Sequence, residues 1–271
     1  MSEEGVARMK SQLQHLIRSV HVALLRRPLP EKMSLYLHST KGYEHRLDEL
    51  LGFLRDHGYV FYGPDEFLRV SGKAAFLSFD DNYRSWMEAL PVLDRYRARA
   101  MFYVNSQPFR DRVGASEMQA YLSRIRAAET RTLATAELRE LAAAGHGIGA
   151  HTHTHPVLSS LPLLQAQEEI RVSKEELQSV LQQPVRDFAY PFGMRRHFSR
   201  TLRHYCRSIG FRTVANAIPC MQYAISREDS LHRSPWFLDL PLAENLDNLR
   251  TDGRVFQALT GRSAVGAGPS S

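Results

Sequence analysis

The sequence predicts an α/β fold built on parallel strands, either a twisted sheet or a β/α barrel. Between about residues 33 and 217, short apolar segments alternate with longer segments whose apolar residues recur every three or four positions. Such alternation is typical of βαβ units, in which helices connect neighbouring parallel strands. No repeat of fixed period and no Pro/Gly/Ser-rich linker interrupts residues 33–250, so we expect a single domain there.

The composition is that of a globular chain with a large core. Of its 271 residues, 43% are hydrophobic and 24% are charged. The formal net charge of +6 comes mainly from scattered arginines without any block of Lys and Arg, so we expect no nucleic-acid partner. The only two cysteines, Cys206 and Cys220, form no C-x-x-C pair, which favours a reducing, cytoplasmic location over a disulfide framework.

Residues 1–32 predict an amphipathic helix ahead of the domain. Apolar residues recur at helical spacing from Val6 to Leu24, acidic residues stand at the front, and no uninterrupted apolar core follows. We therefore expect neither a signal peptide nor a membrane span. We interpret the helix as packed on the domain. Because arginines flank its apolar face, peripheral contact with a membrane surface, and so a membrane-peripheral location, is the alternative.

Four strands are predicted in the first half of the domain, at residues 33–38, 59–62, 74–79 and 100–105. After the first strand, the leucines of residues 43–58 fall on one helical stripe that ends at Gly58. A short helical turn at residues 64–70 precedes the third strand, and a helix through Tyr96 follows it.

A polar, partly helical insertion at residues 106–131 breaks this alternation. An insertion of this length either shapes a substrate site or is a plain surface excursion. The alternation then resumes with helices at 135–145, 162–183 and 198–210, and with strands at 146–150, 187–193 (a strand and turn) and 211–217. Residues 251–271 predict a disordered C-terminal tail.

Two adjacent carboxylates, Asp80 and Asp81, end the third predicted strand in the segment AFLSFDDNY. Parallel β/α folds place their active sites at the carboxyl ends of the strands, where this pair lies. The alternative interpretation is that an aspartate simply caps the helix that follows.

Three histidines follow the predicted strand at 146–150, in the segment GAHTHTHPVL. His151 and His155 are four residues apart, a spacing that lets two imidazoles converge on one cation, whereas His153 should point elsewhere. Two imidazoles and one carboxylate are usual ligands of a catalytic zinc ion. With the aspartate pair they predict a metal site, one Asp binding the metal and the other taking a proton from water. A polar loop that caps the next helix is the alternative.

Three segments resemble the motifs of the polysaccharide deacetylases, carbohydrate esterase family 4. SFDDN at residues 78–82 is similar to the T-F-D-D-G motif, HTHTH at 151–155 to the H-[ST]-x-x-H motif, and FAYPFG at 188–193 to the R-P-P-Y-like motif. The last segment looks like the branch that includes poly-N-acetylglucosamine deacetylases. The resemblance implies a deacetylase-like catalytic domain at residues 33–250 with the fold of a distorted (β/α)7-type barrel.

The resemblance also implies roles for individual residues. Asp81, His151 and His155 correspond to the ligands of a divalent metal, most often zinc. Asp80 corresponds to the general base. The backbone N–H of Phe192 corresponds to the group that polarises the substrate carbonyl.

The sequence departs from the family pattern at two places that concern the mechanism. Ala189 stands where the motif arginine normally orients the general base, and Asn82 replaces the glycine after the aspartates. The late L-x-H motif, which supplies the protonating histidine, has no clear copy. His232 in DSLHRSPWF and His38 in LYLHS are the two candidates for that catalytic acid.

These features predict a hydrolase of carbon–nitrogen bonds other than peptide bonds. We expect metal-dependent removal of the N-acetyl group of an amino sugar in a polysaccharide or glycoconjugate, with release of acetate. One alternative is removal of a formyl or other acyl group from a lipid-linked or nucleotide-linked sugar. The other is a catalytically silent carbohydrate-binding protein on the same fold.

Overall fold

The computed structural model describes residues 28–127, 129–218 and 230–250. The chain divides into two compact units, one formed by Glu31–Asp239 and one formed by Met1–Pro30 together with Leu240–Ser271. In the second unit the structure describes one helix, α9 (Leu242–Arg250). The helix predicted within residues 1–32 falls almost wholly outside the described residues, and the predicted tail at 251–271 lies entirely outside them. In the described part of the chain, no helix is long and apolar enough to cross a membrane.

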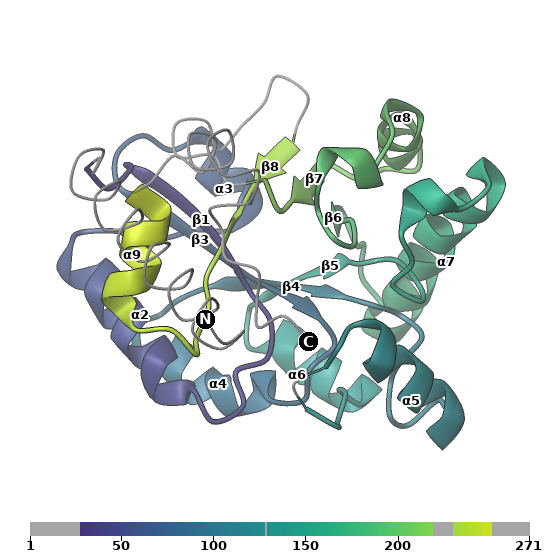
Figure 1. The fold of residues 1–271 in the computed structure, drawn as a ribbon, viewed down its shortest axis with the longest axis horizontal. Coiled ribbons are helices and arrows are strands. Elements are labelled where there is room, and N and C mark those ends of the chain that lie inside the picture. Colours follow the sequence, from purple (N-terminus) through teal and green to yellow (C-terminus); the bar gives the residue numbers. More distant parts are fainter. Residues whose placement is uncertain (1–27, 128, 219–229, 251–271) are drawn as a thin grey trace, which may run out of the picture. The chain divides into compact units, whose positions relative to one another are not determined.

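The unit Glu31–Asp239 is built on a nine-stranded parallel sheet (Figure 1). Its order is β8-β7-β6-β5-β4-β3-β1-β9, and β2 pairs with β3. The strands are β1 (Lys32–Leu37), β2 (Val60–Phe61), β3 (Ala74–Asp81), β4 (Ala100–Val104), β5 (Gly147–Ala150), β6 (Asp187–Ala189), β7 (Thr213–Asn216), β8 (Ser230–His232) and β9 (Ser234–Pro235). The predicted α/β class is confirmed.

The two edges of the sheet are joined through one residue. β8 pairs with β7 at one edge and β9 pairs with β1 at the other, yet only Arg233 separates β8 from β9 in the sequence. The chain therefore passes from one edge to the other within a single residue, which nearly closes the sheet into a barrel. This agrees with the distorted barrel that the sequence predicts.

Helices connect and surround the strands (Figure 1). They are α2 (Glu44–Asp56), α3 (Pro64–Arg69), α4 (Trp86–Arg95), α5 (Ala115–Arg124), α6 (Thr135–Ala143), α7 (Leu163–Leu181) and α8 (Arg200–Ser208). The leucine stripe of α2 is fully buried, and Gly58 with a φ of +79° follows the helix as predicted. Helix α5 is the helical part of the insertion at 106–131.

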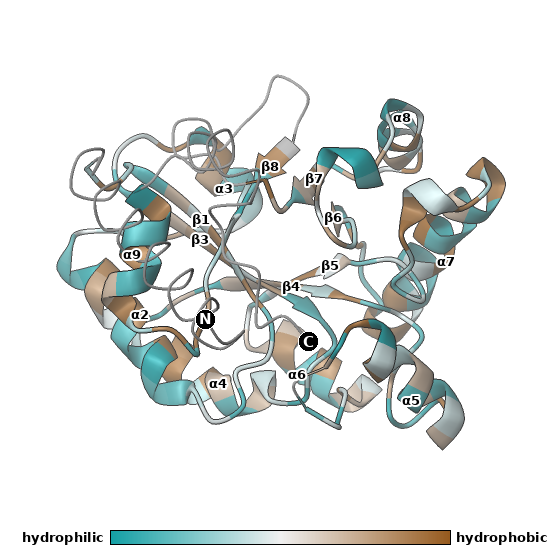
Figure 2. Ribbon diagram, in the orientation of Figure 1, coloured by the Kyte–Doolittle hydropathy of each residue, from teal (hydrophilic) through white to brown (hydrophobic). Residues whose placement is uncertain are grey.

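The core lies between the strands and these helices. All eight residues of β3 are buried, as expected for a strand that is covered on both faces. The ring of Phe79 on β3 stacks on Phe102 of β4 at 5.0 Å between centroids, and Trp86 of α4 packs against Phe102. Figure 2 shows helices with hydrophobic and hydrophilic residues on different sides, which is the pattern that the helical periodicity predicted.

Two described strands and one described α-helix have no counterpart among the sequence predictions, namely β8, β9 and α9. The two strands contain only three and two residues, too few for any periodic pattern. They exist because neighbouring strands supply their hydrogen-bond partners. This matters for the site, since Arg233 lies between them.

Candidate active site

Asp80 and Asp81 end strand β3 and line one pocket. In a regular strand, neighbouring side chains point to opposite faces. Asp81, however, has a φ of +85°, so the backbone leaves strand geometry at this residue. Both adjacent carboxylates can therefore line the same cavity, although they follow each other in the strand. Positive φ values also occur at Thr152, His155 and Phe192, so several residues with a strained backbone lie at or next to this pocket.

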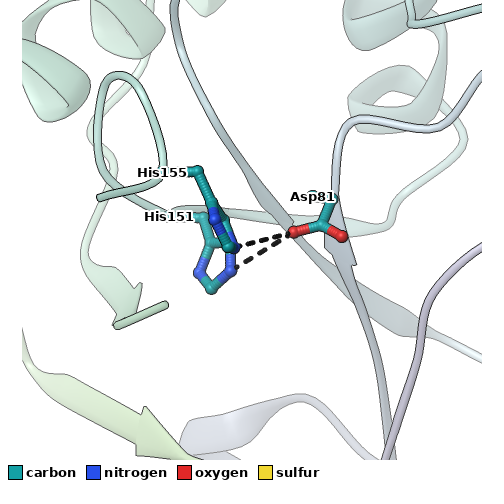
Figure 3. Close-up of side chains that lie close together, drawn as sticks. All are labelled: Asp81, His151 and His155. Carbon is teal, nitrogen blue, oxygen red and sulfur yellow. Dashed lines mark ion pairs between the residues drawn. The ribbon is translucent and has the colours of Figure 1, made fainter. Parts of the chain in front are cut away.

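Asp81, His151 and His155 converge to form a candidate metal centre (Figure 3). The Oδ1 atom of Asp81 lies 3.6 Å from Nε2 of His151 and 3.2 Å from Nε2 of His155. One ligand atom from each residue lies within 4.8 Å of the others. Asp81 Oδ1 is buried and accepts no hydrogen bond within the described structure. A buried carboxylate oxygen between two imidazole nitrogens fits a divalent cation.

His151 is prepared to act as a neutral ligand. Its Nδ1–H donates to the backbone carbonyl of Ala189 at 2.7 Å, which leaves Nε2 with a lone pair that faces Asp81. Burial lowers the pKa of His151 to about 4, so the ring carries no proton on Nε2 at neutral pH. The segment FAYPFG therefore contributes a backbone acceptor at the position where the family motif has an arginine.

The loop from His151 to His155 bends so that both rings meet Asp81. Thr152 and His155 have φ values of +70° and +63°, and the His155 N–H donates to the Thr152 hydroxyl at 3.1 Å. His153, between them, hydrogen-bonds through Nδ1 to the hydroxyl of Ser106 at 2.8 Å. Two of the three histidines thus serve the pocket.

The electrostatics keep Asp81 ionised. Burial by itself would raise the pKa of this carboxyl, but the close approach of His155, followed by the nearby His38 and His151 rings, holds it well below its usual range. A carboxylate that stays charged while buried is the form that binds a cation.

Asp80 is held by Arg233, a residue that the sequence analysis did not single out. The guanidinium donates to both carboxylate oxygens of Asp80, at 2.6 and 2.8 Å. It also donates to the Ser78 hydroxyl at 2.9 Å and to the Asn216 carbonyl at 3.1 Å. Its side chain is only 1% exposed, so this is a buried bidentate ion pair.

Two aromatic rings fix the guanidinium further. The Cζ atom of Arg233 lies 5.1 Å from the ring centre of Tyr36 and 4.9 Å from that of Tyr103. Arg233 therefore supplies Asp80 with the guanidinium that Ala189 cannot supply, from the residue between β8 and β9. The only sequence signal was a lone arginine in the apolar segment LHRSPWF, and no local pattern connects it with Asp80.

The turn after β6 brings Phe192 to the pocket. Phe192 and Gly193 have φ values of +62° and +58°, and the Gly193 carbonyl accepts from the Ala217 N–H at 3.0 Å. A Cβ atom at Gly193 would lie 2.4 Å from the Ala217 nitrogen, so only glycine fits. The Phe192 side chain is 45% exposed and its ring lies edge-on to His155, at 5.1 Å between centroids.

The two candidate acids have different surroundings. His38 lines the pocket with Asp80 and Asp81, and its ring lies edge-on to Tyr36. The His232 ring is hydrogen-bonded to the Asn216 side chain, and among the described residues it is not part of the pocket lining. Burial, followed by the charges of two nearby arginines, lowers the pKa of His232, which disfavours a protonated ring.

The two aspartates, the two histidines of the candidate metal centre, Phe192, Arg233 and His38 line one cavity of about 1060 Å³, large enough for a small-molecule or sugar ligand. Its lining consists of Tyr36, His38, Ser39, Lys41, Tyr43, Asp80, Asp81, Tyr83, Arg124, Ile125, Arg126, His151, His155, Tyr190, Phe192, Gly193, Ala217, Arg233, Trp236, Phe237, Leu238 and Asp239. The arrangement combines a candidate cation site, a separately held carboxylate, the turn at Phe192 and a histidine.

Solved structures share this fold. The Streptococcus pyogenes deacetylase PplD, in complex with acetate, matches with a TM-score of 0.63 and 21% identity over 83% of this chain and 99% of its own. IcaB from Ammonifex degensii matches with a TM-score of 0.64 and 19% identity over 83% and 98%. The BpsB deacetylase domain from Bordetella bronchiseptica matches with a TM-score of 0.63 and 16% identity over 77% and 97%. At these identities the likeness establishes the fold.

Sequence comparison identifies the family. YxkH of Bacillus subtilis (strain 168), which is named as a polysaccharide deacetylase, is 26% identical over 159 residues, or 56% of this chain. The matched region spans about half the length of that relative, 50%. The sequence pattern described as polysaccharide deacetylase matches residues 68–214, more than half of the chain and including Asp80, Asp81 and both pocket histidines. The chain therefore belongs to the polysaccharide deacetylase family.

Proposed function

We propose that the protein is a metal-dependent hydrolase that removes the N-acetyl group from an amino sugar in a polysaccharide or glycoconjugate and releases acetate. The observation that carries this proposal is the different surroundings of two adjacent carboxylates. Asp81 faces two imidazole nitrogens, whereas Asp80 is paired with a buried arginine in the same pocket. One carboxylate is thus available to a cation and the other to a proton.

Asp81, His151 and His155 would hold the metal, and zinc suits this set of two imidazoles and one carboxylate. Two observations support this assignment. Asp81 Oδ1 has no hydrogen-bond partner in the described structure, and His151 bonds the Ala189 carbonyl through Nδ1, which leaves Nε2 free to bind a metal. When bound, the ion supplies a Lewis acid that polarises the acetamide carbonyl and lowers the pKa of water at the site.

Asp80 would accept the proton of the attacking water. A carboxylate has about four lone-pair positions, so the two bonds from Arg233 leave acceptor capacity that can face the pocket. Arg233 itself cannot take the proton because a guanidinium stays protonated. Its role is to hold the Asp80 carboxylate in one orientation.

The two remaining steps concern the carbonyl oxygen and the leaving amine. The Phe192 N–H would donate to the oxygen as negative charge develops there, and the strained turn keeps this donor in place. His38 would protonate the amine, since it shares the cavity with Asp80 whereas His232 is bonded to Asn216.

A catalytically silent binding protein is a weaker alternative than the sequence suggested. That alternative relied on the missing arginine at Ala189 and on the unclear acid. Arg233 supplies a guanidinium for Asp80, and His38 supplies a histidine in the cavity. Both observations favour an active enzyme.

The direct test is acetate release from short N-acetylglucosamine oligomers, measured together with bound zinc. Asp80→Asn should keep the zinc and lose activity by about a hundredfold to ten-thousandfold. Asp81→Asn should lose the zinc because it removes a charged ligand. In the same assay, His38→Ala should lose turnover and His232→Ala should keep it.

Two outcomes would contradict this assignment. If Asp80→Asn loses zinc while Asp81→Asn keeps it, the two aspartate roles are reversed. If zinc binds but no acetate is released from any N-acetylated sugar, the deacetylase proposal fails. A matched series of N-formyl oligomers then decides whether the site removes a different acyl group.

A further inference from the structure

Three basic side chains line the same cavity as the two carboxylates. Lys41 follows strand β1, while Arg124 and Arg126 lie at the end of helix α5, in the insertion at 106–131. All three are exposed, and none forms an ion pair with a carboxylate in the part of the chain that the structure describes. The guanidinium of Arg124 donates to the Thr154 carbonyl, a neutral group. Their charges are therefore available to a ligand.

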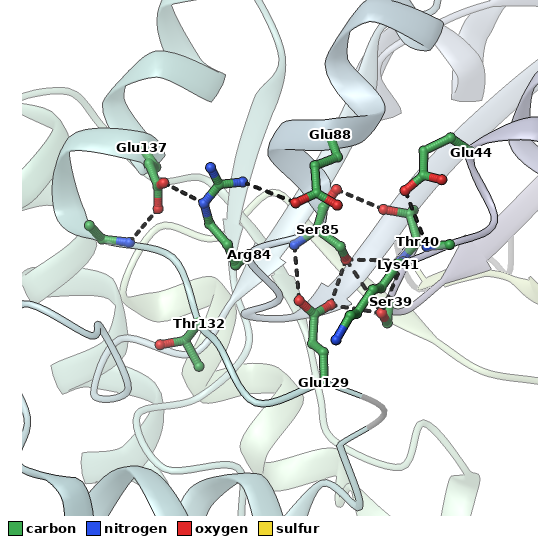
Figure 4. A network of polar contacts seen from close by, with 12 residues as sticks. Ser39, Thr40, Lys41, Glu44, Arg84, Ser85, Glu88, Glu129, Thr132 and Glu137 are labelled. Carbon is green, nitrogen blue, oxygen red and sulfur yellow. Dashed lines mark hydrogen bonds and ion pairs between the residues drawn. The ribbon is translucent and has the colours of Figure 1, made fainter.

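A buried carboxylate anchors the segments that carry these cations (Figure 4). Glu129 is only 6% exposed and accepts from the Ser39 hydroxyl at 2.7 Å, the Ser85 hydroxyl at 2.5 Å and the Ser85 N–H at 3.1 Å. The Thr40 N–H donates to the Ser85 hydroxyl at 3.0 Å, and the Lys41 N–H donates to the Ser39 hydroxyl at 3.2 Å. Charge-assisted bonds of this kind give the loop a defined position.

The same network fixes the other segment. Glu129 stands three residues after Arg126, so the bonds that hold Ser39 also hold the end of the insertion beside the loop of Lys41. Lys41 and Arg126 therefore come from segments that are tied together through one side chain. Cations on anchored segments lose less entropy on binding a ligand than cations on free loops do.

The charges in the cavity do not balance. Asp80 is neutralised by Arg233, and Asp81 faces the candidate metal site. Among the lining residues the remaining acid is Asp239, against three cations. A neutral N-acetylglucosamine polymer offers no partner for this excess. Guanidinium and ammonium groups instead match phosphate and carboxylate oxygens.

We propose that the substrate is an N-acetylated amino sugar with an anionic substituent, a phosphate or a carboxylate group, which binds Lys41, Arg124 and Arg126. The acetamide of the same sugar unit or of its neighbour lies at Asp80 and Asp81. This inference rests on the proposed deacetylase function and adds a substrate class to it. It also gives the insertion at 106–131 the role of a specificity element.

The test compares probes that differ in charge. N-acetylglucosamine 1-phosphate, N-acetylglucosamine 6-phosphate and N-acetylmuramic acid are compared with neutral N-acetylglucosamine by kcat/KM for acetate release. We expect a preference for at least one anionic probe of about tenfold or more, equivalent to about 1.4 kcal/mol. The preference should shrink as ionic strength rises. The anionic probe with the largest kcat/KM relative to neutral N-acetylglucosamine shows whether the site prefers a phosphate or a carboxylate group.

Variants connect this preference to the named residues. Lys41→Gln combined with Arg126→Gln should reduce the ratio of anionic to neutral kcat/KM to near one. The control is Arg69→Gln, an exposed arginine at the end of α3, which leads into the opposite, amino-terminal end of β3. The control should leave the ratio unchanged. If the double variant keeps the preference for anionic probes, the anion binds elsewhere, for example to the metal alone. That result overturns the inference.

Binding without turnover separates this inference from the proposed function. Calorimetry of N-acetylglucosamine 1-phosphate with zinc-loaded Asp80→Asn, with and without the Lys41 and Arg126 substitutions, measures anion binding directly. Loss of affinity in the substituted protein supports the anion site even if no acetate is released by the wild type. Equal kcat/KM for charged and neutral probes contradicts the inference and leaves the deacetylase assignment intact.

Discussion

At the scale of single residues, the Asp80 carboxylate is held by a guanidinium from the junction between β8 and β9. Arg233 is 153 positions away in the sequence, yet it donates to both oxygens of the carboxylate. Tyr36 and Tyr103 pack on it, and the Ser78 hydroxyl and the Asn216 carbonyl accept two further hydrogen bonds from it. Such a pair costs desolvation energy, so its value lies in orientation rather than in stability.

Substitutions of Arg233 should therefore distinguish its effect on the orientation of Asp80 from its effect on the stability of the fold. Arg233→Gln leaves Asp80 buried without its charged partner and should destabilise the fold by roughly 3–5 kcal/mol. Arg233→Lys keeps the charge but cannot donate in parallel to both oxygens, so stability should recover in part. Because the base is then misplaced, kcat should still fall on the order of a hundredfold, with bound zinc unchanged.

Denaturant unfolding and steady-state kinetics measure these two effects. Arg212→Gln is the matched control, because Arg212 forms an exposed ion pair with Asp65 at 3.2 Å and its loss should cost less than about 1 kcal/mol. A lysine variant with full kcat would show that Arg233 serves only the fold.

At the scale of elements, strand β6 has one end at the candidate active site and its other end away from it. The Ala189 carbonyl at its carboxyl end accepts a hydrogen bond from His151, and Asp187 at its amino end is partly buried. The Thr213 hydroxyl on β7 donates to Asp187 at 2.6 Å. Burial raises the pKa of Asp187 to about 6, against the opposing effect of this hydrogen bond and of Arg212 and Arg186.

This shift predicts a pH dependence of stability. In the unfolded chain Asp187 ionises near pH 4, whereas in the folded protein it ionises near pH 6. The stabilising contribution of the protonated carboxyl is therefore present below about pH 4 and is lost as the pH rises to about 6. Asp187→Asn keeps an oxygen acceptor for Thr213 and should raise the free energy of unfolding at pH 8 by up to about 3 kcal/mol, with little gain at pH 4.

Urea unfolding of both proteins at the two pH values measures this difference. Comparison of variant with wild type removes the effect of other titrating groups. An equal gain at pH 4 and pH 8 would mean that the substitution acts through packing and not through ionisation.

At the scale of the whole molecule, the ligands of the candidate metal site come from one strand and one loop that meet only in the folded chain. Asp81 belongs to β3, and His151 and His155 follow β5. A cation that binds this arrangement and not the unfolded chain must stabilise the fold.

Zinc should therefore raise the midpoint of thermal unfolding. At free zinc of about 100 times Kd, the gain is about 2.7 kcal/mol. For a domain of this size that corresponds to a rise of roughly 5–11 °C. A chelator should reverse the rise, and Asp81→Asn should abolish it, while Asp187→Asn should retain it. Equal shifts in wild type and Asp81→Asn would place the zinc elsewhere.

The sequence by itself determined the α/β class, seven of the strands, and the chemistry of SFDDN, HTHTH and FAYPFG. These features are local: periodicity identifies elements, and short spacings identify ligands. The tertiary structure alone decided that Arg233 replaces the motif arginine, that β8 and β9 nearly close the barrel, and that His38 rather than His232 shares the cavity. Each of these depends on contacts between residues far apart in the chain, and the two strands are too short to carry a pattern of their own. Such contacts arise only when the sheet assembles, because neighbouring strands and not local propensity supply the partners.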